Sequence, residues 1–69
     1  SEAVALSLGE KLRARRESRG LTQDELARRS GLTQEMISNL ERGKHQPRFD
    51  TLAKYATGLG MTVTSLLGH

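Results

Sequence analysis

Side chains with paired hydrogen-bonding groups gather between residues 34 and 39. Glutamine and asparagine carry an amide donor beside an amide acceptor, glutamate carries only acceptors, and serine carries a hydroxyl that does both. An amide can form two hydrogen bonds with N6 and N7 of adenine, and a carboxylate can accept one from N4 of cytosine. On a helix that buries Ile37 and Leu40, these groups would share the exposed face. The side chains are Gln34, Glu35, Ser38 and Asn39.

Catalytic and metal-binding chemistry is not indicated by the residue types. The sequence has no cysteine, which removes thiol catalysis, cysteine metal sites and disulfides, and fits a reducing cytoplasm. Its two histidines, His45 and His69, lie far apart, and there is no nucleophile–base pair or phosphate-cradling glycine loop. We therefore expect a protein that is not an enzyme and that needs no metal or cofactor.

The charge of the chain favours a polyanionic partner. Eleven Lys and Arg residues against eight Asp and Glu residues give a net charge of +3, with an isoelectric point near 10.0. Binding a polyanion would release its counter-ions, although many small proteins carry a similar excess and charge alone does not identify the partner. No apolar run approaches the length of a membrane span, and the stretch 3–6 is too short for a signal sequence.

Helix ends are marked throughout the sequence. Ser7 with Glu10, and Thr22 with Glu25, fit the capping box, in which hydroxyl and carboxylate satisfy backbone N–H groups reciprocally. Four glycines follow runs of good helix formers, where a left-handed residue ends a helix. They are Gly20, Gly31, Gly43 and Gly60. The sequence predicts an all-α domain over 1–69, with 1–6 as an arm and helices at 7–19, 22–29, 33–42, 49–58 and 62–67.

Apolar residues at helical spacing predict one core of mostly aliphatic side chains. Three residues in or next to the fourth helix are notable: Arg48 has no side-chain acceptor to cap it, Gly58 falls within its last turn, and Tyr55 needs a hydrogen-bond partner for its hydroxyl. We interpret Gly58 as either a close contact across a partner or a loosened helix end. The predicted core consists of Leu8, Leu12, Leu21, Leu26, Ala27, Leu32, Ile37, Leu40, Phe49, Leu52, Ala53, Ala56, Leu59, Val63 and Leu66.

The segment 22–42 has the residue spacing of a helix-turn-helix. Ala27 is small where two helices must approach, Gly31 sits at the turn, and Ile37 anchors the second helix. The segment resembles the phage repressor and Cro family, also called the xenobiotic-response-element family. The likeness covers residues 8–67 and extends to Leu12, Arg16, Gly20, Leu21, Thr22, Gln23, Leu40, Glu41, Arg42, Gly43, Pro47, Thr51 and Leu52.

The resemblance implies a five-helix lambda-repressor-like DNA-binding domain whose second and third helices form the motif. Residues 33–42 would lie in the major groove, with Gln34, Glu35, Ser38 and Asn39 at base edges. Met36 would more often pack on the core than touch a thymine methyl group. The positions that match backbone contacts in the family are Gln23, Thr33, Lys44, His45 and Arg48.

The family also implies internal contacts. Gln23 matches the position that braces the first base-contacting glutamine, and Arg16 and Glu41 match an internal ion pair between the first and third helices. We expect a homodimer, formed through 49–58 and 62–67, on a palindromic operator.

The function that these features favour is sequence-specific binding of double-stranded DNA, as a transcriptional repressor in the cytoplasm of a bacterium or a phage host. An antitoxin or a controller of a restriction system would use the same DNA-binding fold. A protein-bridging transcription cofactor is the alternative from another class, but such a surface has no need of base-pairing side chains.

Overall fold

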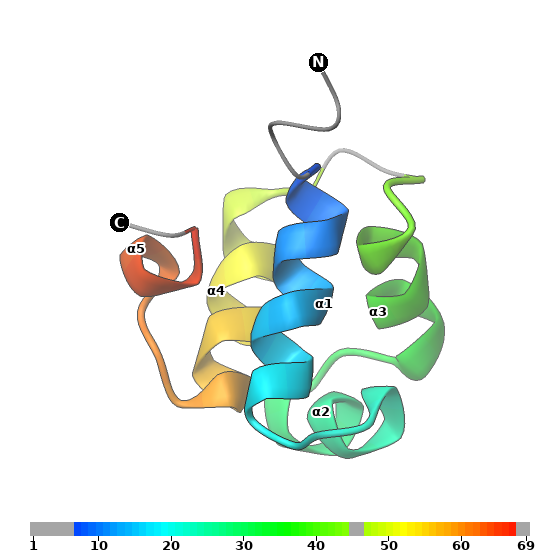
Figure 1. Ribbon diagram of the computed structural model, residues 1–69. Coiled ribbons are helices and arrows are strands. Elements are labelled where there is room, and N and C mark those ends of the chain that lie inside the picture. The colour runs from blue at the N-terminus through cyan, green and yellow to red at the C-terminus, as the bar shows by residue number, and fades with distance from the viewer. Residues whose placement is uncertain (1–6, 45–46, 68–69) are drawn as a thin grey trace.

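The chain forms five helices, seen in a computed structural model that describes residues 7–44 and 47–67 (Figure 1). Every helix end lies within one residue of its predicted position. Within those two ranges there is no strand, so the all-α prediction is confirmed. The residues expected to form an N-terminal arm lie outside the described ranges. The helices are α1 (Leu8–Ser18), α2 (Gln23–Ser30), α3 (Gln34–Glu41), α4 (Phe49–Leu59) and α5 (Val63–Leu66).

Local hydrogen bonds start the first two helices as the sequence predicts. Ser7 Oγ accepts from the backbone of Glu10 at 3.2 Å, and the Glu10 carboxylate accepts from the backbone of Ser7 at 3.0 Å. Thr22 and Glu25 form the same reciprocal pair, at 3.1 and 2.8 Å. These backbone and side-chain bonds from Thr22 also lower the pKa of Glu25. Both predicted capping boxes are present.

The turn between α2 and α3 depends on Gly31. Its φ of +81° lies in the left-handed region that favours glycine, and its N–H donates to the carbonyl of Ala27 at 3.1 Å. Two residues later Thr33 caps α3 by accepting from the backbone of Met36 at 3.1 Å. The chain therefore leaves one helix and starts the next within three residues.

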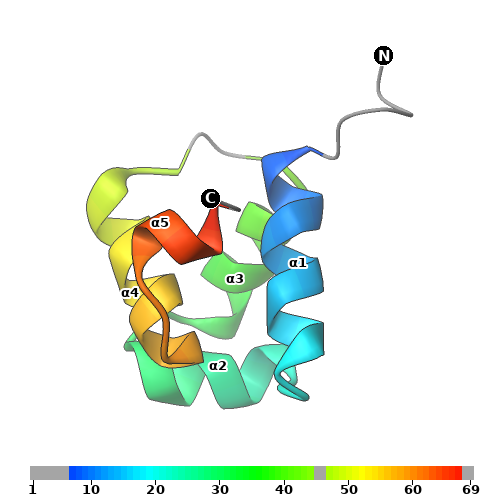
Figure 2. The same cartoon turned by 60° about the vertical axis from the view of Figure 1, so that its left-hand side comes forward.

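The helices pack around one core, with α2 against α4 and α1 against both α3 and α5. Figures 1 and 2 show α2 at one end of the molecule, beneath α1 and α4. In the view of Figure 1, α3 and α5 lie on opposite sides of α1. None of the described helices is both long and apolar enough to cross a membrane. The buried core residues are Leu12, Leu26, Leu32, Ile37, Leu40, Leu52, Tyr55, Ala56, Leu59 and Leu66.

The two aromatic residues differ from the predicted core. Apolar spacing predicts Phe49 in the core, but this residue is 74% exposed. A helical side chain leans toward the N-terminus of its helix, and Phe49 is the first residue of α4, so it extends past the start of the helix. Tyr55, which the predicted core omits, is fully buried. Of the remaining predicted core residues, Leu8, Leu21, Ala27, Ala53 and Val63 are partly buried.

Gly58 allows α4 to approach α2 within the same chain. A Cβ at this position would lie 2.6 Å from Cδ1 of Leu26 and 2.9 Å from Cβ of Ser30. The interpretation of Gly58 as a close contact across a partner is therefore wrong, because it is buried inside the fold where α4 meets α2. Glycine destabilises a helix by about 1 kcal/mol relative to alanine, but at this position it leaves the space that α2 occupies.

Arg48 is expected to be the weakest cap in the fold. It has the extended backbone of an N-cap residue, φ −87° and ψ 159°, but its side chain makes no capping hydrogen bond. Arg48→Ser should raise the free energy of unfolding by about 1 kcal/mol, because the hydroxyl satisfies an N–H group at the start of α4. Urea denaturation measures the change. Arg48→Ala is the control, since it removes the same charge without adding a cap; equal midpoints for the two variants would contradict the prediction.

Candidate nucleic-acid interface

One face of α3 is open to solvent and carries the side chains with paired hydrogen-bonding groups. Ile37, Leu40 and Glu41 are buried and fix the helix on the core. Gln34 and Glu35 are exposed, and Ser38 and Asn39, one turn further along, are half-buried. Residues four apart on a helix are neighbours, so the four side chains form two adjacent pairs on one surface.

Met36 belongs to this surface and not to the core. Its side chain is 42% exposed, so the expectation that it packs against the interior is not met. Its backbone N–H is the donor to the Thr33 cap, which places it in the first turn of α3. An exposed methionine adds an apolar, adaptable contact to a face that otherwise carries amides, a hydroxyl and a carboxylate.

A buried ion pair ties the end of α3 to α1. Arg16 donates from Nε and Nη2 to the two carboxylate oxygens of Glu41, at 2.7 and 2.9 Å, and from Nη1 to the carbonyl of Leu21 at 2.7 Å. The two side chains are only 9% and 3% exposed. The ion pair that the resemblance implies is thus present in the structure, and its two hydrogen bonds make it bidentate.

Tyr55 completes the environment of Glu41. Its hydroxyl lies 2.6 Å from Oε2 of Glu41 and 2.9 Å from the carbonyl of Leu12, so the buried phenol has partners. Burial raises the pKa of Tyr55 and the adjacent carboxylate raises it further. Burial alone would raise the pKa of Glu41, but hydrogen bonds from Arg16, Tyr55 and Gln23 outweigh it and lower the pKa. Glu41 is therefore a carboxylate at neutral pH.

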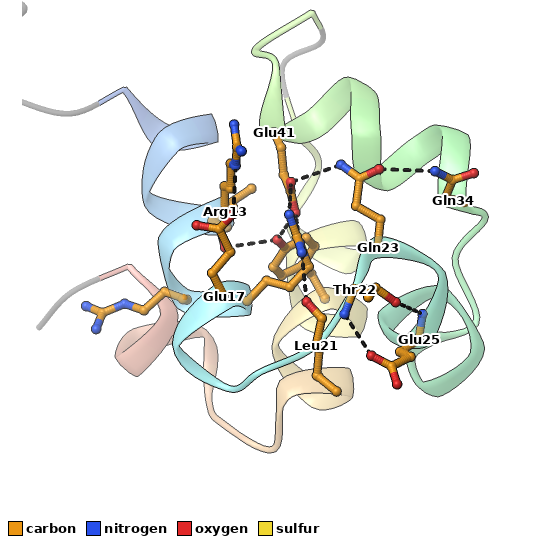
Figure 3. Close-up of polar contacts among 12 residues, drawn as sticks. Arg13, Glu17, Leu21, Thr22, Gln23, Glu25, Gln34 and Glu41 are labelled. Atoms are coloured by element: carbon orange, nitrogen blue, oxygen red, sulfur yellow. Dashed lines mark hydrogen bonds and ion pairs between the residues drawn. The ribbon is translucent and has the colours of Figure 1, made fainter.

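A chain of hydrogen bonds leads from this ion pair to the exposed face of α3. Gln23 donates from Nε2 to Oε1 of Glu41 at 3.1 Å, and Gln34 donates from Nε2 to Oε1 of Gln23 at 3.2 Å. Figure 3 shows Gln23 between the other two side chains, with its amide directed at both. The bracing contact that the resemblance implies for Gln23 is thus present, and it continues into the core.

A groove beside this chain of contacts was missed by the sequence analysis. Its volume is about 410 Å³ and two of its lining residues, Arg13 and Arg42, are exposed cations. Arg13 also pairs with Glu17 at 3.1 Å on the surface of α1. The only sequence signal was helical spacing, since Arg13 lies one turn before Arg16 and Arg42 directly follows Glu41. The groove is lined by Arg13, Arg16, Gln23, Ser38, Glu41 and Arg42.

Further cations follow the exposed helix. The backbone N–H of Lys44 donates to the carbonyl of Asn39 at 3.0 Å, which holds Lys44 beside the end of α3. Lys44 and Arg48 are both exposed. His45 lies outside the described residues. Exposed cations next to a face rich in amides suit a ligand that combines negative charge with hydrogen-bonding edges.

Known proteins share this architecture. The helix-turn-helix family model matches residues 12–66. The immunity repressor protein of Bacillus phage phi105 is 32% identical over 64 residues, which are 93% of this chain but 44% of that protein. The restriction-modification controller protein C.AhdI of Aeromonas hydrophila has a TM-score of 0.81 at 34% identity, over 86% of this chain and 89% of that one. The P22 c2 repressor, solved with a synthetic operator, has a TM-score of 0.78 at 28% identity, over 93% and 97%.

These matches agree with the arrangement of the helices. The family model begins within α1 and ends at the last residue of α5, so it includes most of α1 and the whole of the other four helices. The chain spans less than half the length of the phage repressor that it matches. The chain belongs to the helix-turn-helix family of DNA-binding regulators, and its five-helix fold is of the phage-repressor type.

Proposed function

We propose that residues 1–69 form one domain that binds a specific double-stranded DNA sequence with α3 in the major groove and represses transcription from that site. The observation that carries the proposal is the exposed face of α3, where two amides, a carboxylate and a hydroxyl stand beside cations. An α-helix fits the major groove of B-DNA, and only there does each base pair present a distinct pattern of donors and acceptors. Such a regulator would act in the cytoplasm of a bacterium or of a phage host.

The side chains divide into two groups by the part of DNA that they would contact. Gln34, Glu35, Ser38 and Asn39 would form hydrogen bonds with base edges and so determine sequence preference. Gln23 and Thr33 stand at the starts of α2 and α3, where backbone N–H groups and the helix dipole favour a phosphate. The cations of the following loop, Lys44, His45 and Arg48, would contact the sugar-phosphate backbone.

The direct test is selection from a randomised duplex pool at moderate salt, followed by sequencing of the retained DNA. Enrichment of a defined sequence would support the proposal. Retention of DNA without any enriched sequence, or no retention, would overturn it and favour the protein-bridging alternative.

Asn39→Ala and Lys44→Ala should affect DNA binding differently. Asn39→Ala should cost about 1–3 kcal/mol at one base position and relax the preference there, because an amide pairs with one base. Lys44→Ala should weaken binding to all sequences alike and reduce the salt dependence of log K by about one unit, because a phosphate contact carries no base information. Fluorescence anisotropy on single-position operator variants over a salt series measures both. If both variants weaken all sequences equally, the division into two groups is wrong.

We also propose a homodimer formed through α4 and α5. The apolar side chains of Met61, Val63 and Leu67 are only partly buried at this end of the molecule, which supports a partner surface there. Two copies related by a two-fold axis would place their α3 helices about 34 Å apart, one turn of DNA, on a palindrome. Sedimentation of the complex tests this, since a single copy bound to a full operator would contradict it.

A controller of a restriction–modification system is the second candidate. It is favoured by the controller protein C.AhdI, of which this chain covers 89%. Such a controller would bind DNA in the same way but regulate a nuclease and a methyltransferase, so an enriched sequence upstream of that gene pair would favour it.

A further inference from the structure

The hydrogen bonds that lead from the core to Gln34 have a fixed direction. Glu41 is a carboxylate, which accepts hydrogen bonds and cannot donate one. Its two oxygens have four donors: Arg16 Nε and Nη2, the Tyr55 hydroxyl and Gln23 Nε2. A carboxylate has about four acceptor sites, so those of Glu41 are filled. Because the Glu41 carboxylate can only accept, the Gln23 atom that faces it must be the amide nitrogen.

This direction continues to the surface of α3. With its nitrogen turned to Glu41, Gln23 presents its oxygen to Gln34, and an oxygen can only accept. Gln34 must then turn its own nitrogen inward, as the 3.2 Å contact has it. One N–H of Gln34 is used in this contact. The groups that remain for a ligand are one N–H and the amide oxygen.

The remaining pair of groups distinguishes adenine from guanine. In the major groove adenine offers an acceptor at N7 beside a donor at N6, which one N–H and one oxygen can satisfy together. Guanine offers acceptors at both N7 and O6, so the amide oxygen of Gln34 would face an oxygen. An amide free to turn over could direct both N–H groups at guanine, as the ammonium of lysine does.

We propose that Glu41 is a specificity-determining positioning residue: by fixing the amide direction of Gln23, and through it that of Gln34, it selects adenine over guanine at the base that Gln34 contacts. The inference rests on the proposed function, because it needs Gln34 at a base edge. Discrimination of roughly 5- to 150-fold is expected, since an unmatched polar pair at a base edge costs about 1–3 kcal/mol.

The test reverses the direction of the hydrogen bonds without touching Glu41, whose removal would leave the buried Arg16 without its partner. Gln23→Lys places an ammonium, which only donates, between Glu41 and Gln34. Gln34 must then turn its oxygen inward and both N–H groups outward. Gln23→Met is the matched control, because it has a similar length and no polar group that directs Gln34.

Duplex selection is carried out with the unaltered chain, Gln34→Ala, Gln23→Lys, Gln23→Met and the double variant Gln23→Lys/Gln34→Ala. The base-pair position at which Gln34→Ala loses its sequence preference is the position that Gln34 contacts. There we expect adenine for the unaltered chain, guanine for Gln23→Lys, and a weakened but uninverted preference for Gln23→Met. The preferences at other positions should stay, which shows that α3 is still seated in the groove.

Four results would overturn the inference while leaving the proposed function intact. If Gln23→Lys still prefers adenine at this position, Gln23 acts only as a support. The same conclusion follows if Gln23→Lys and Gln23→Met weaken the preference for adenine equally. Guanine preferred by the double variant would mean that the lysine itself contacts the base. If Gln34→Ala keeps the sequence preference at every position of the site, Gln34 does not contact a base. If the unaltered chain enriches no sequence, the proposed function fails, and the inference with it.

Discussion

Glu41→Ala is expected to lower the free energy of unfolding by about 3–5 kcal/mol, because it leaves the guanidinium of Arg16 buried without a counter-charge. Arg16 is only 7% exposed as a residue and would lose two hydrogen bonds, and Tyr55 would lose its closest partner. A domain of this size seldom has more than about 3–5 kcal/mol of stability from its core. The variant should therefore be largely unfolded at 25 °C, which far-UV circular dichroism and urea denaturation would show.

Glu17→Ala is the matched control for a lost ion pair. Glu17 pairs with Arg13 at 3.1 Å, but both side chains are more than half exposed, so its loss should cost at most about 0.5 kcal/mol. A second variant, Arg16→Met with Glu41→Leu, removes both charges together and should be more stable than Glu41→Ala alone. Equal losses for Glu41→Ala and Glu17→Ala would contradict the assignment of Glu41 as the central buried contact.

The helices of this protein were predictable because the signals that start and end them are local. Ser7 with Glu10 and Thr22 with Glu25 form hydrogen bonds across three residues, so the chain needs no tertiary partner to use them. Gly31 adopts a positive φ directly after α2, where a capping residue is needed in any helical fold. Boundaries determined by such contacts can be found from residue types alone.

The limits of the core were not predictable in the same way. Helical periodicity states which face of α4 turns inward, but it does not state how far the neighbouring helices extend along that face. Phe49 has the correct spacing and lies beyond the packed region, whereas Tyr55 is buried because Glu41, fourteen residues earlier, accepts its hydrogen bond. That pairing depends on the angle between two helices, which the sequence pattern does not contain.

The candidate site shows the same division. The exposed face of α3 follows from the burial of Ile37 and Leu40, and the ion pair of Arg16 with Glu41 was expected only from the family resemblance. The link from Gln23 to Glu41 and the groove that includes Arg13 and Arg42 join residues from three helices, and spacing within one helix does not state which helices meet. The contacts with DNA themselves stay predictions until binding is measured.

Gly9 is the second position at which one added group should have a large effect. A Cβ there would lie 2.5 Å from the carbonyl oxygen of Glu41 and 2.7 Å from that of Leu40, at the end of α3. These are backbone atoms, which cannot rotate away as a side chain can. The capping-box motif that contains Gly9 gives no hint of this, because the contact is with a helix some thirty residues later in the sequence.

Gly9→Val should therefore lower the free energy of unfolding by about 3 kcal/mol, at the upper end of the cost of overpacking a core. Urea denaturation at neutral pH measures the loss. Ala14→Val is the control, since Ala14 is exposed on the same helix and the change costs only helix propensity, at most about 0.7 kcal/mol. Similar small losses for both variants would mean that α1 can move away from α3 at little cost. A large loss at Gly9 alone would show that the distance between these helices is fixed where Glu41 holds α3 in place.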